Sequence, residues 1–231
     1  MDKRVPRGRG KASEYRLFWR GFKHLATVIA FTLTLASAQT AAAQTVIAIL
    51  GDSLVAGFGL AADDAFPARL EAALRETGED VRVINAGVSG DTSAGGLARL
   101  DWVLGDNPDI VLVELGSNDS LRGLDPAATF DNLDAIVTRL KARDVTVLLA
   151  GMMAPRNLGR EYVAAFDAIY PRLAGKHAVA LYPFFLDGVA LDPALNQADL
   201  IHPNEEGVGV IVEKILPSVR AVLQDHRRIA N

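Results

Sequence analysis

The chain has 231 residues, of which half are hydrophobic and 23% are charged, a composition typical of a globular protein. It contains no cysteine, which excludes a thiol nucleophile, cysteine-ligated metal, disulfide bonds and a lipid-modified N-terminal cysteine. The formal charge of −4 is unevenly distributed, because residues 1–43 carry eight basic and two acidic residues, and the remainder carries 16 basic and 26 acidic residues. An acidic body lacks the basic surface that nucleic acid requires, so we expect no nucleic-acid partner.

The N-terminal segment, residues 1–43, has the pattern of a secretory signal peptide. A basic n-region (1–24) precedes an uncharged apolar h-region (25–38), and small-residue cleavage patterns end at residues 38 and 43. The apolar stretch is shorter than the roughly 20 residues that span a bilayer, although an uncleaved N-terminal membrane anchor is the alternative. We therefore expect a periplasmic or secreted monomer, with a single domain over residues 44–231 and no membrane span after cleavage.

The rest of the chain alternates aliphatic runs with helical periodicity. Nearly continuous aliphatic and β-branched runs indicate strands buried on both faces. In chain order these predicted strands cover residues 45–50, 81–85, 109–115, 144–150 and, as a short fifth strand, 179–182. Four helices are predicted in chain order. The first starts near residue 66 and stops at 78, and the second starts at 125–126. The third covers 160–175, and the last is opened by residues 203–204. This alternation predicts a three-layer α/β/α domain with a doubly wound, flavodoxin-like parallel sheet of five strands.

Chemistry in such a domain is expected beyond the carboxyl ends of the strands. The first strand ends in Gly51-Asp52-Ser53, which places Ser53 where a nucleophile would be exposed, although a serine there can equally cap a helix. The motif is neither the nucleophile elbow of α/β-hydrolases nor a phosphate-binding loop. Ser53 is thus a candidate nucleophile.

Two further polar segments follow the next two strands. Gly90 lies in a glycine-containing turn whose backbone N–H groups could point at a developing anion, although an ordinary strand-to-helix turn would look the same. Asn118 follows the third strand, where its amide could donate to an oxyanion or instead form an Asx-turn. Both residues are candidate oxyanion donors.

His202 is the best candidate for a general base. Asp199 precedes it by three residues in a loop stiffened by Pro203, and a base must be held in one tautomer by an acceptor on its other ring nitrogen. The other histidines lack a carboxylate at this spacing or fall in the leader, the C-terminal tail or a connection. The four segments that contain Ser53, Gly90, Asn118 and His202 occur in order at predicted strand ends or on the last loop, and this order favours a hydrolase.

With these segments in place, the chain resembles the SGNH, or GDSL, hydrolase superfamily. Its four blocks match Gly51-Asp52-Ser53, Gly90, Gly116-Ser117-Asn118-Asp119 and Asp199-Leu200-Ile201-His202. The resemblance implies Ser53 as nucleophile, His202 as general base and then acid, and Asp199 as the orienting acceptor. It also implies an oxyanion hole made by the backbone N–H groups of Ser53 and Gly90 and the side chain of Asn118. Ser117 stands where glycine is common, and Leu200-Ile201 also depart from the frequent pattern.

Several stretches resemble the branch of bacterial periplasmic thioesterase I, lysophospholipase L1 and arylesterase enzymes, including Ala56–Leu60, Leu121–Gly123 and 153–173. In that branch the loops after the strands contact the acyl chain, which would make Met152, Met153, Ala154 and Pro155 candidates for an apolar acyl groove, with core packing as the alternative.

We therefore expect a serine esterase and thioesterase that hydrolyses aryl esters, acyl-CoA or lysophospholipids through an acyl-enzyme, without a metal or cofactor. The alternatives are an O-acetyl carbohydrate esterase of the same superfamily and, more remotely, a non-catalytic periplasmic binding module.

Overall fold

The structure is a computed structural model that describes residue 1 and residues 44–230, so residues 2–43 of the predicted signal peptide lie outside the described part. The described strands form one parallel sheet in the order β2-β1-β3-β4-β5. They are β1 (Thr45–Gly51), β2 (Val81–Gly87), β3 (Ile110–Glu114), β4 (Thr146–Ala150) and β5 (Ala180–Tyr182). The chain first extends the sheet from β1 to β2 and then continues on the other side of β1, which confirms the predicted doubly wound topology.

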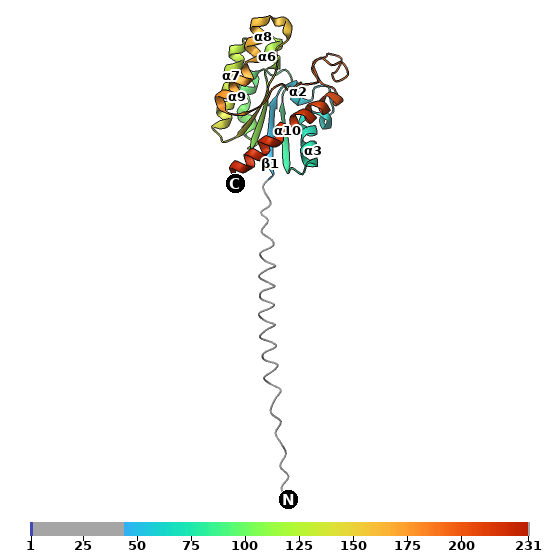
Figure 1. Ribbon diagram of the computed structural model, residues 1–231, viewed down its shortest axis with the longest axis vertical. Helices are drawn as coiled ribbons and strands as arrows, with labels where there is room; N and C mark the ends of the chain where they lie inside the picture. The colour runs from blue at the N-terminus through green and yellow to red at the C-terminus, as the bar shows by residue number, and fades with distance from the viewer. Residues whose placement is uncertain (2–43, 231) are drawn as a thin grey trace. The chain divides into compact units, whose positions relative to one another are not determined.

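Helices cover both faces of this sheet (Figure 1). On one face α3 (Phe66–Glu76) packs against α10 (Glu205–Ala230). On the other face α7 (Pro126–Lys141) packs against α4 (Ser93–Ala98) and α9 (Ile169–His177), while α5 (Leu100–Leu104) follows α4. The three-layer α/β/α arrangement is therefore confirmed. Within residues 44–230, no helix combines the length and hydrophobicity needed to cross a membrane.

The central strands are hydrophobic because helices cover both of their faces. All five residues of β3 are buried, and β1 and β4 are buried apart from one partly exposed residue each. The prediction that residues 81–85 form a fully buried strand is wrong. β2 lies at the edge of the sheet, where Arg82 and Asn85 are exposed.

The helices begin and end mostly where local chemistry predicts. Asp125 accepts the Ala127 N–H and Pro126 opens α7, while α3 ends before Gly78, which adopts a φ of +86°. The single helix predicted over 160–175 is in fact two helices, α8 (Arg160–Asp167) and α9. Pro171 explains the break, since it has no N–H to donate to the carbonyl of Asp167 and its ring would clash there.

Three short helices at the carboxyl edge of the sheet were not predicted from hydrophobic periodicity. They are α2 (Ser53–Ala56) after β1, α6 (Ser117–Leu121) after β3 and α4 after β2. Each has only four to six residues, too few for a hydrophobic repeat to appear. α2 and α6 nevertheless position candidate site residues, because they begin directly after β1 and β3 end.

Candidate active site

Ser53 is the first residue of α2 and is almost completely buried, with 9% of its surface exposed. The helix cap that the sequence left open for Ser53 is made instead by Asp52, whose carboxylate accepts the Leu54 N–H at 3.0 Å. The Ser53 hydroxyl is therefore free of capping and lies 2.9 Å from Nε2 of His202. This arrangement suits a nucleophile whose proton must be removed.

His202 and Asp199 lie on the loop between β5 and α10. Nδ1 of His202 is 2.7 Å from Oδ2 of Asp199, while the other oxygen of Asp199 accepts the backbone N–H groups of His202 and Ile201 at 3.0 and 2.9 Å. These backbone and ring donors lower the pKa of Asp199 to about 2. Asp199 therefore remains a carboxylate, and it holds the ring so that Nε2 faces Ser53.

Contacts between two distant segments hold this loop in place. The Gln197 amide donates to the backbone carbonyls of Phe58 (2.7 Å) and Pro203 (3.0 Å), and the Phe58 ring lies 4.5 Å from the ring of His202. A glycine is required at position 59, because its φ is +77° and a Cβ there would lie 2.3 Å from Oε1 of Gln197. The turn after α2 is thus fixed to the histidine loop.

Asn118, in α6, lines the same pocket as Ser53 and His202. Its amide donates to Oδ2 of Asp52 at 3.0 Å, so the side chain reaches across to the end of β1. Ser117, the departure from the family pattern, donates its hydroxyl to the same carboxylate oxygen. Asp52 thereby connects the start of α6 to the start of α2.

Gly90 lies on the exposed turn after β2 and is not among the residues that line the pocket. It adopts a φ of +83°, and its carbonyl accepts a hydrogen bond from Nη2 of Arg122 at 2.8 Å. Arg122 is the C-terminal cap of α6, so this bond ties the Gly90 turn to the helix that carries Asn118. Thr92 caps the helix that follows the turn.

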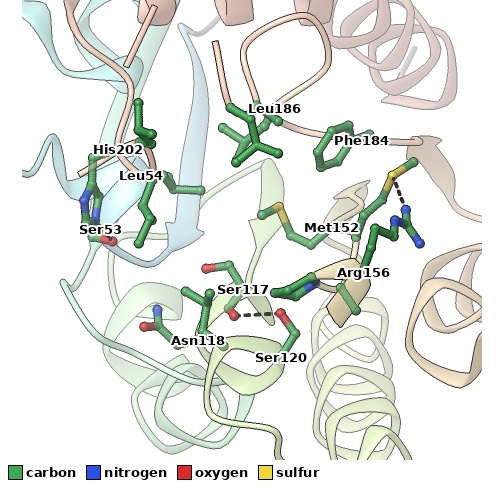
Figure 2. A pocket seen from close by; sticks show the side chains of 18 of the residues that line it. Ser53, Leu54, Ser117, Asn118, Ser120, Met152, Arg156, Phe184, Leu186 and His202 are labelled. Carbon is green, nitrogen blue, oxygen red and sulfur yellow. Dashed lines mark hydrogen bonds between the residues drawn. The ribbon is translucent and has the colours of Figure 1, made fainter. Parts of the chain in front are cut away.

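The pocket beside these residues has a volume of about 590 Å³ and is lined mainly by apolar side chains. Figure 2 shows Ser53 and His202 at one end and Arg156 at the other, with Met152, Leu186 and Phe184 between them. The predicted groove residues Met152, Met153, Ala154 and Pro155 all line this pocket. Met152 and Ala154 are also buried and belong to the hydrophobic core, so these two residues both line the pocket and pack in the core.

None of the other eight apolar residues of the lining was predicted from the sequence. They are Leu54, Leu121, Phe184, Leu186, Ala190, Leu191, Leu200 and Ile201. Five large apolar side chains of the lining are exposed, namely Leu121, Met153, Leu191, Leu200 and Ile201. The carboxyl-end rule could have found Phe184 and Leu186, because they directly follow the last strand of the sheet.

The chain is similar to known proteins over most of its length. The model of the GDSL-like Lipase/Acylhydrolase family matches residues 49–210. The chain is 42% identical over 186 residues to Esterase TesA of Pseudomonas aeruginosa, covering 80% of this chain and 92% of that protein. It is 44% identical over 182 residues to Thioesterase 1/protease 1/lysophospholipase L1 of Escherichia coli K12, covering 78% and 86%. A crystal structure of TesA superposes with a TM-score of 0.73 at 40% identity, covering 78% of this chain and 99% of that one.

Proposed function

The chain belongs to the GDSL-like Lipase/Acylhydrolase family and is a serine esterase and thioesterase, and from this premise we propose which residues carry out the reaction. Ser53 is the nucleophile, His202 the general base and then acid, and Asp199 the acceptor that orients His202. The backbone N–H groups of Ser53 and Gly90 and the side chain of Asn118 form the oxyanion hole. The observation that supports this assignment is the chain of hydrogen bonds from Asp199 through His202 to Ser53.

The reaction proceeds in two acyl transfers. His202 removes the proton of Ser53 while Oγ attacks the carbonyl carbon, and the resulting oxyanion accepts hydrogen bonds from the oxyanion hole. As the tetrahedral intermediate collapses, His202 donates the proton to the leaving alcohol or thiol. A water molecule, deprotonated by His202, then attacks the acyl-enzyme, and His202 returns this proton to Oγ of Ser53 as the bond to the acid breaks. No cofactor takes part in these steps.

The substrate class follows from the pocket. An apolar volume of about 590 Å³ beside the nucleophile suits an acyl chain, since burial of each CH₂ contributes about 0.8 kcal/mol. We assign this role to Met152, Met153, Ala154 and Pro155 together with Phe184 and Leu186. Aryl esters, acyl-CoA and lysophospholipids fit this description better than an O-acetyl sugar, which offers only a methyl group to the pocket.

We also propose that the protein is exported through the signal peptide over residues 1–43 and acts in the periplasm or outside the cell. The sequence pattern of a basic segment, an apolar stretch and small residues supports this assignment. Expression of the full chain should give a mature protein that begins at residue 39 or 44 in the exported fraction. A protein that keeps its leader and stays with the membrane would contradict the proposal.

Covalent labelling with a fluorophosphonate tests the proposed nucleophile. The wild-type protein beginning at Gln44 should be labelled and should hydrolyse a series of p-nitrophenyl esters, acyl-CoAs and lysophospholipids. Ser53→Ala should lose the label and the activity, whereas Ser218→Ala, a control on α10, should keep both. Labelling that persists in Ser53→Ala would move the nucleophile elsewhere, and activity confined to acetylated sugars would favour the carbohydrate esterase.

A further inference from the structure

Two neighbouring residues, Asp52 and Glu114, place their carboxyl groups in the protein interior next to the proposed nucleophile Ser53. Asp52 and Glu114 are both 0% exposed, and the backbone N–H of Asp52 donates to Oε2 of Glu114 at 3.3 Å. In the sheet, Glu114 of β3 is paired with Gly51 of β1. A Cβ at position 51 would lie 2.8 Å from Oε2 of Glu114, so the glycine leaves space for this carboxyl group.

The hydrogen bonds of the two carboxyl groups differ strongly. Asp52 accepts the backbone N–H of Leu54, the hydroxyl of Ser117 and the side-chain amide of Asn118. Glu114, in contrast, has one buried oxygen, Oε1, with no hydrogen-bond partner. Donors stabilise the anionic form of a carboxyl group, whereas a buried oxygen without donors disfavours it. A single negative charge on this pair therefore belongs on Asp52.

The surroundings do not compensate a second negative charge. Within residues 44–230, no lysine, arginine or histidine forms an ion pair with either carboxyl group. Arg99 comes near, since it donates to the carbonyl of Gly51 at 2.8 Å, but its carboxylate partner is Asp91 at 2.6 Å. The other titratable groups that act electrostatically on the pair are Tyr170 of α9, which is buried, and His202 of the proposed triad, whose charge acts on Asp52.

The electrostatic effects on the two groups agree with the hydrogen bonds. Burial and then the charge of Asp52 raise the pKa of Glu114 well above its usual value of 4.5. Burial also raises the pKa of Asp52, but its hydrogen bonds to Ser117, Leu54 and Asn118 and the nearby His202 oppose this rise. Two carboxyl groups that share a buried site seldom ionise together.

We infer that Glu114 holds a proton at neutral pH, so that Asp52 remains an anion and fixes the side-chain amide of Asn118 in the orientation that the oxyanion requires. This inference rests on the proposed function, because it assigns Asn118 as an oxyanion donor. A primary amide has two N–H donors, and with one held by Asp52 the other is available to the substrate oxyanion. Asp52 and Glu114 are thus positioning residues, which act through Asn118 and do not touch the reacting atoms.

The substitution Asp52→Asn tests the positioning role. An asparagine at position 52 cannot accept from Leu54, Ser117 and Asn118 together, because one of its two side-chain atoms is a donor. The amide of Asn118 should lose its fixed orientation, and kcat should fall by about 10²–10³-fold, as for loss of an oxyanion donor, with little change in KM. Asp125→Asn makes the same change at the cap of α7, outside the pocket, and should leave kcat unchanged.

A double-mutant cycle separates positioning from a general structural effect. If Asp52 acts through Asn118, the double variant Asp52→Asn/Asn118→Ala should be no slower than Asn118→Ala alone. Losses in kcat that multiply in the double variant would overturn the positioning role. An Asn118→Ala variant with wild-type kcat would instead contradict the proposed oxyanion hole, so the two failures are distinguishable.

Infrared spectroscopy of the folded protein at neutral pH tests the proton on Glu114 directly. The wild-type protein should show the carbonyl stretch of a protonated, buried carboxylic acid. This band should disappear in Glu114→Gln and persist in Asn118→Ala, which keeps both carboxyl groups. Absence of the band from the wild type, or its survival in Glu114→Gln, would overturn the inference. The comparison does not require Asp52→Asn to fold.

Discussion

Asp199 shows how a partly exposed residue can keep a defined charge. About 38% of its side chain is exposed, yet its pKa is about 2 because the backbone N–H groups of His202 and Ile201 and the ring of His202 donate to it. Asp199 precedes His202 by three residues, so the loop can fold back on itself. One carboxylate then accepts hydrogen bonds from both the backbone N–H groups and the histidine ring. The charge of Asp199 is thus secured locally, without burial.

We predict that Asp199→Asn keeps the loop conformation but loses activity. Its Oδ1 can still accept the two backbone N–H groups, but its amide nitrogen would face Nδ1 of His202 and force that atom to be an acceptor. The ring proton would then lie on Nε2, which could no longer accept the proton of Ser53. We expect kcat/KM for p-nitrophenyl butyrate to fall on the order of 10²–10⁴-fold.

The control for this prediction is Asp192→Asn on the same long loop. Asp192 also accepts a backbone N–H two residues ahead, from Ala194 at 2.9 Å, so the substitution makes a comparable change away from the histidine. It should leave kcat/KM near the wild-type value. Wild-type activity in Asp199→Asn would remove Asp199 from the proposed triad.

At the scale of single residues, the proximity of Ser53, Asn118 and His202 could be predicted from the sequence, whereas the residues that support them could not. Ser53, Asn118 and His202 each follow a recognisable strand or turn, so the carboxyl-end rule predicts that they meet, as the structure shows for the pocket. Glu114 was missed, although a charged residue inside the apolar run 109–115 is unusual for a buried strand. Its partner depends on which neighbouring strand packs beside it, and the periodicity of one strand carries no such information.

At the scale of elements, a second buried carboxylate connects the short helices around the site. Asp119 of α6 accepts the hydroxyl and the backbone N–H of Ser93 at 2.5 and 2.8 Å, and the hydroxyl of Thr129 at 3.1 Å. Asp119 is 1% exposed and Ser93 is 0% exposed, so these donors have no access to water. The carboxylate therefore joins the start of α4 to α6 and α7.

We predict that Asp119→Ala destabilises the fold by about 2–3 kcal/mol. The substitution leaves the N–H and hydroxyl of Ser93 buried without an acceptor, and each such loss costs about 1–3 kcal/mol. Urea denaturation followed by circular dichroism measures the free energy of unfolding. Thr129→Val is the matched control, since it removes only one donor to Asp119 and should cost about 1 kcal/mol. A stability equal to the wild type in Asp119→Ala would contradict this account of how α4 is held.

Element types were easier to predict than element ends or short elements. Long strands and α7 carry a repeated hydrophobic pattern, whereas α2 and α6 are defined by caps and by the strand ends that precede them. The division of 160–175 into α8 and α9 was readable from Pro171, because a proline inside a helical pattern removes a hydrogen bond. The exposure of β2 was not readable, because strand order in the sheet depends on tertiary packing.

At the scale of the whole molecule, buried and exposed carboxyl groups affect stability in opposite pH ranges. The pKa of Asp199 is lowered in the folded state, so its contribution to stability is present above about pH 3.8 and is lost as the pH falls toward about 2. The pKa of Glu114 is raised, so the folded state holds a proton that the unfolded state releases above about pH 4.5. The contribution of Glu114 is therefore full below that pH and declines as the pH rises toward its folded pKa.

We predict that Glu114→Gln makes the stability of the protein less sensitive to a rise in pH above about 4.5. Where the folded state alone binds this proton, each unit by which the pH rises lowers the free energy of unfolding by at most about 1.4 kcal/mol. This range lies between the unfolded and the folded pKa of Glu114. Glutamine cannot ionise, so the variant should lose less stability than the wild type as the pH rises from about 5 to neutrality. Urea denaturation of both proteins across this range measures the difference in slope, and Glu161→Gln, an exposed residue of α8, should follow the wild type. Parallel slopes for the wild type and Glu114→Gln would mean that the folded protein holds no extra proton at Glu114, because only a proton that the unfolded chain releases can make stability depend on pH.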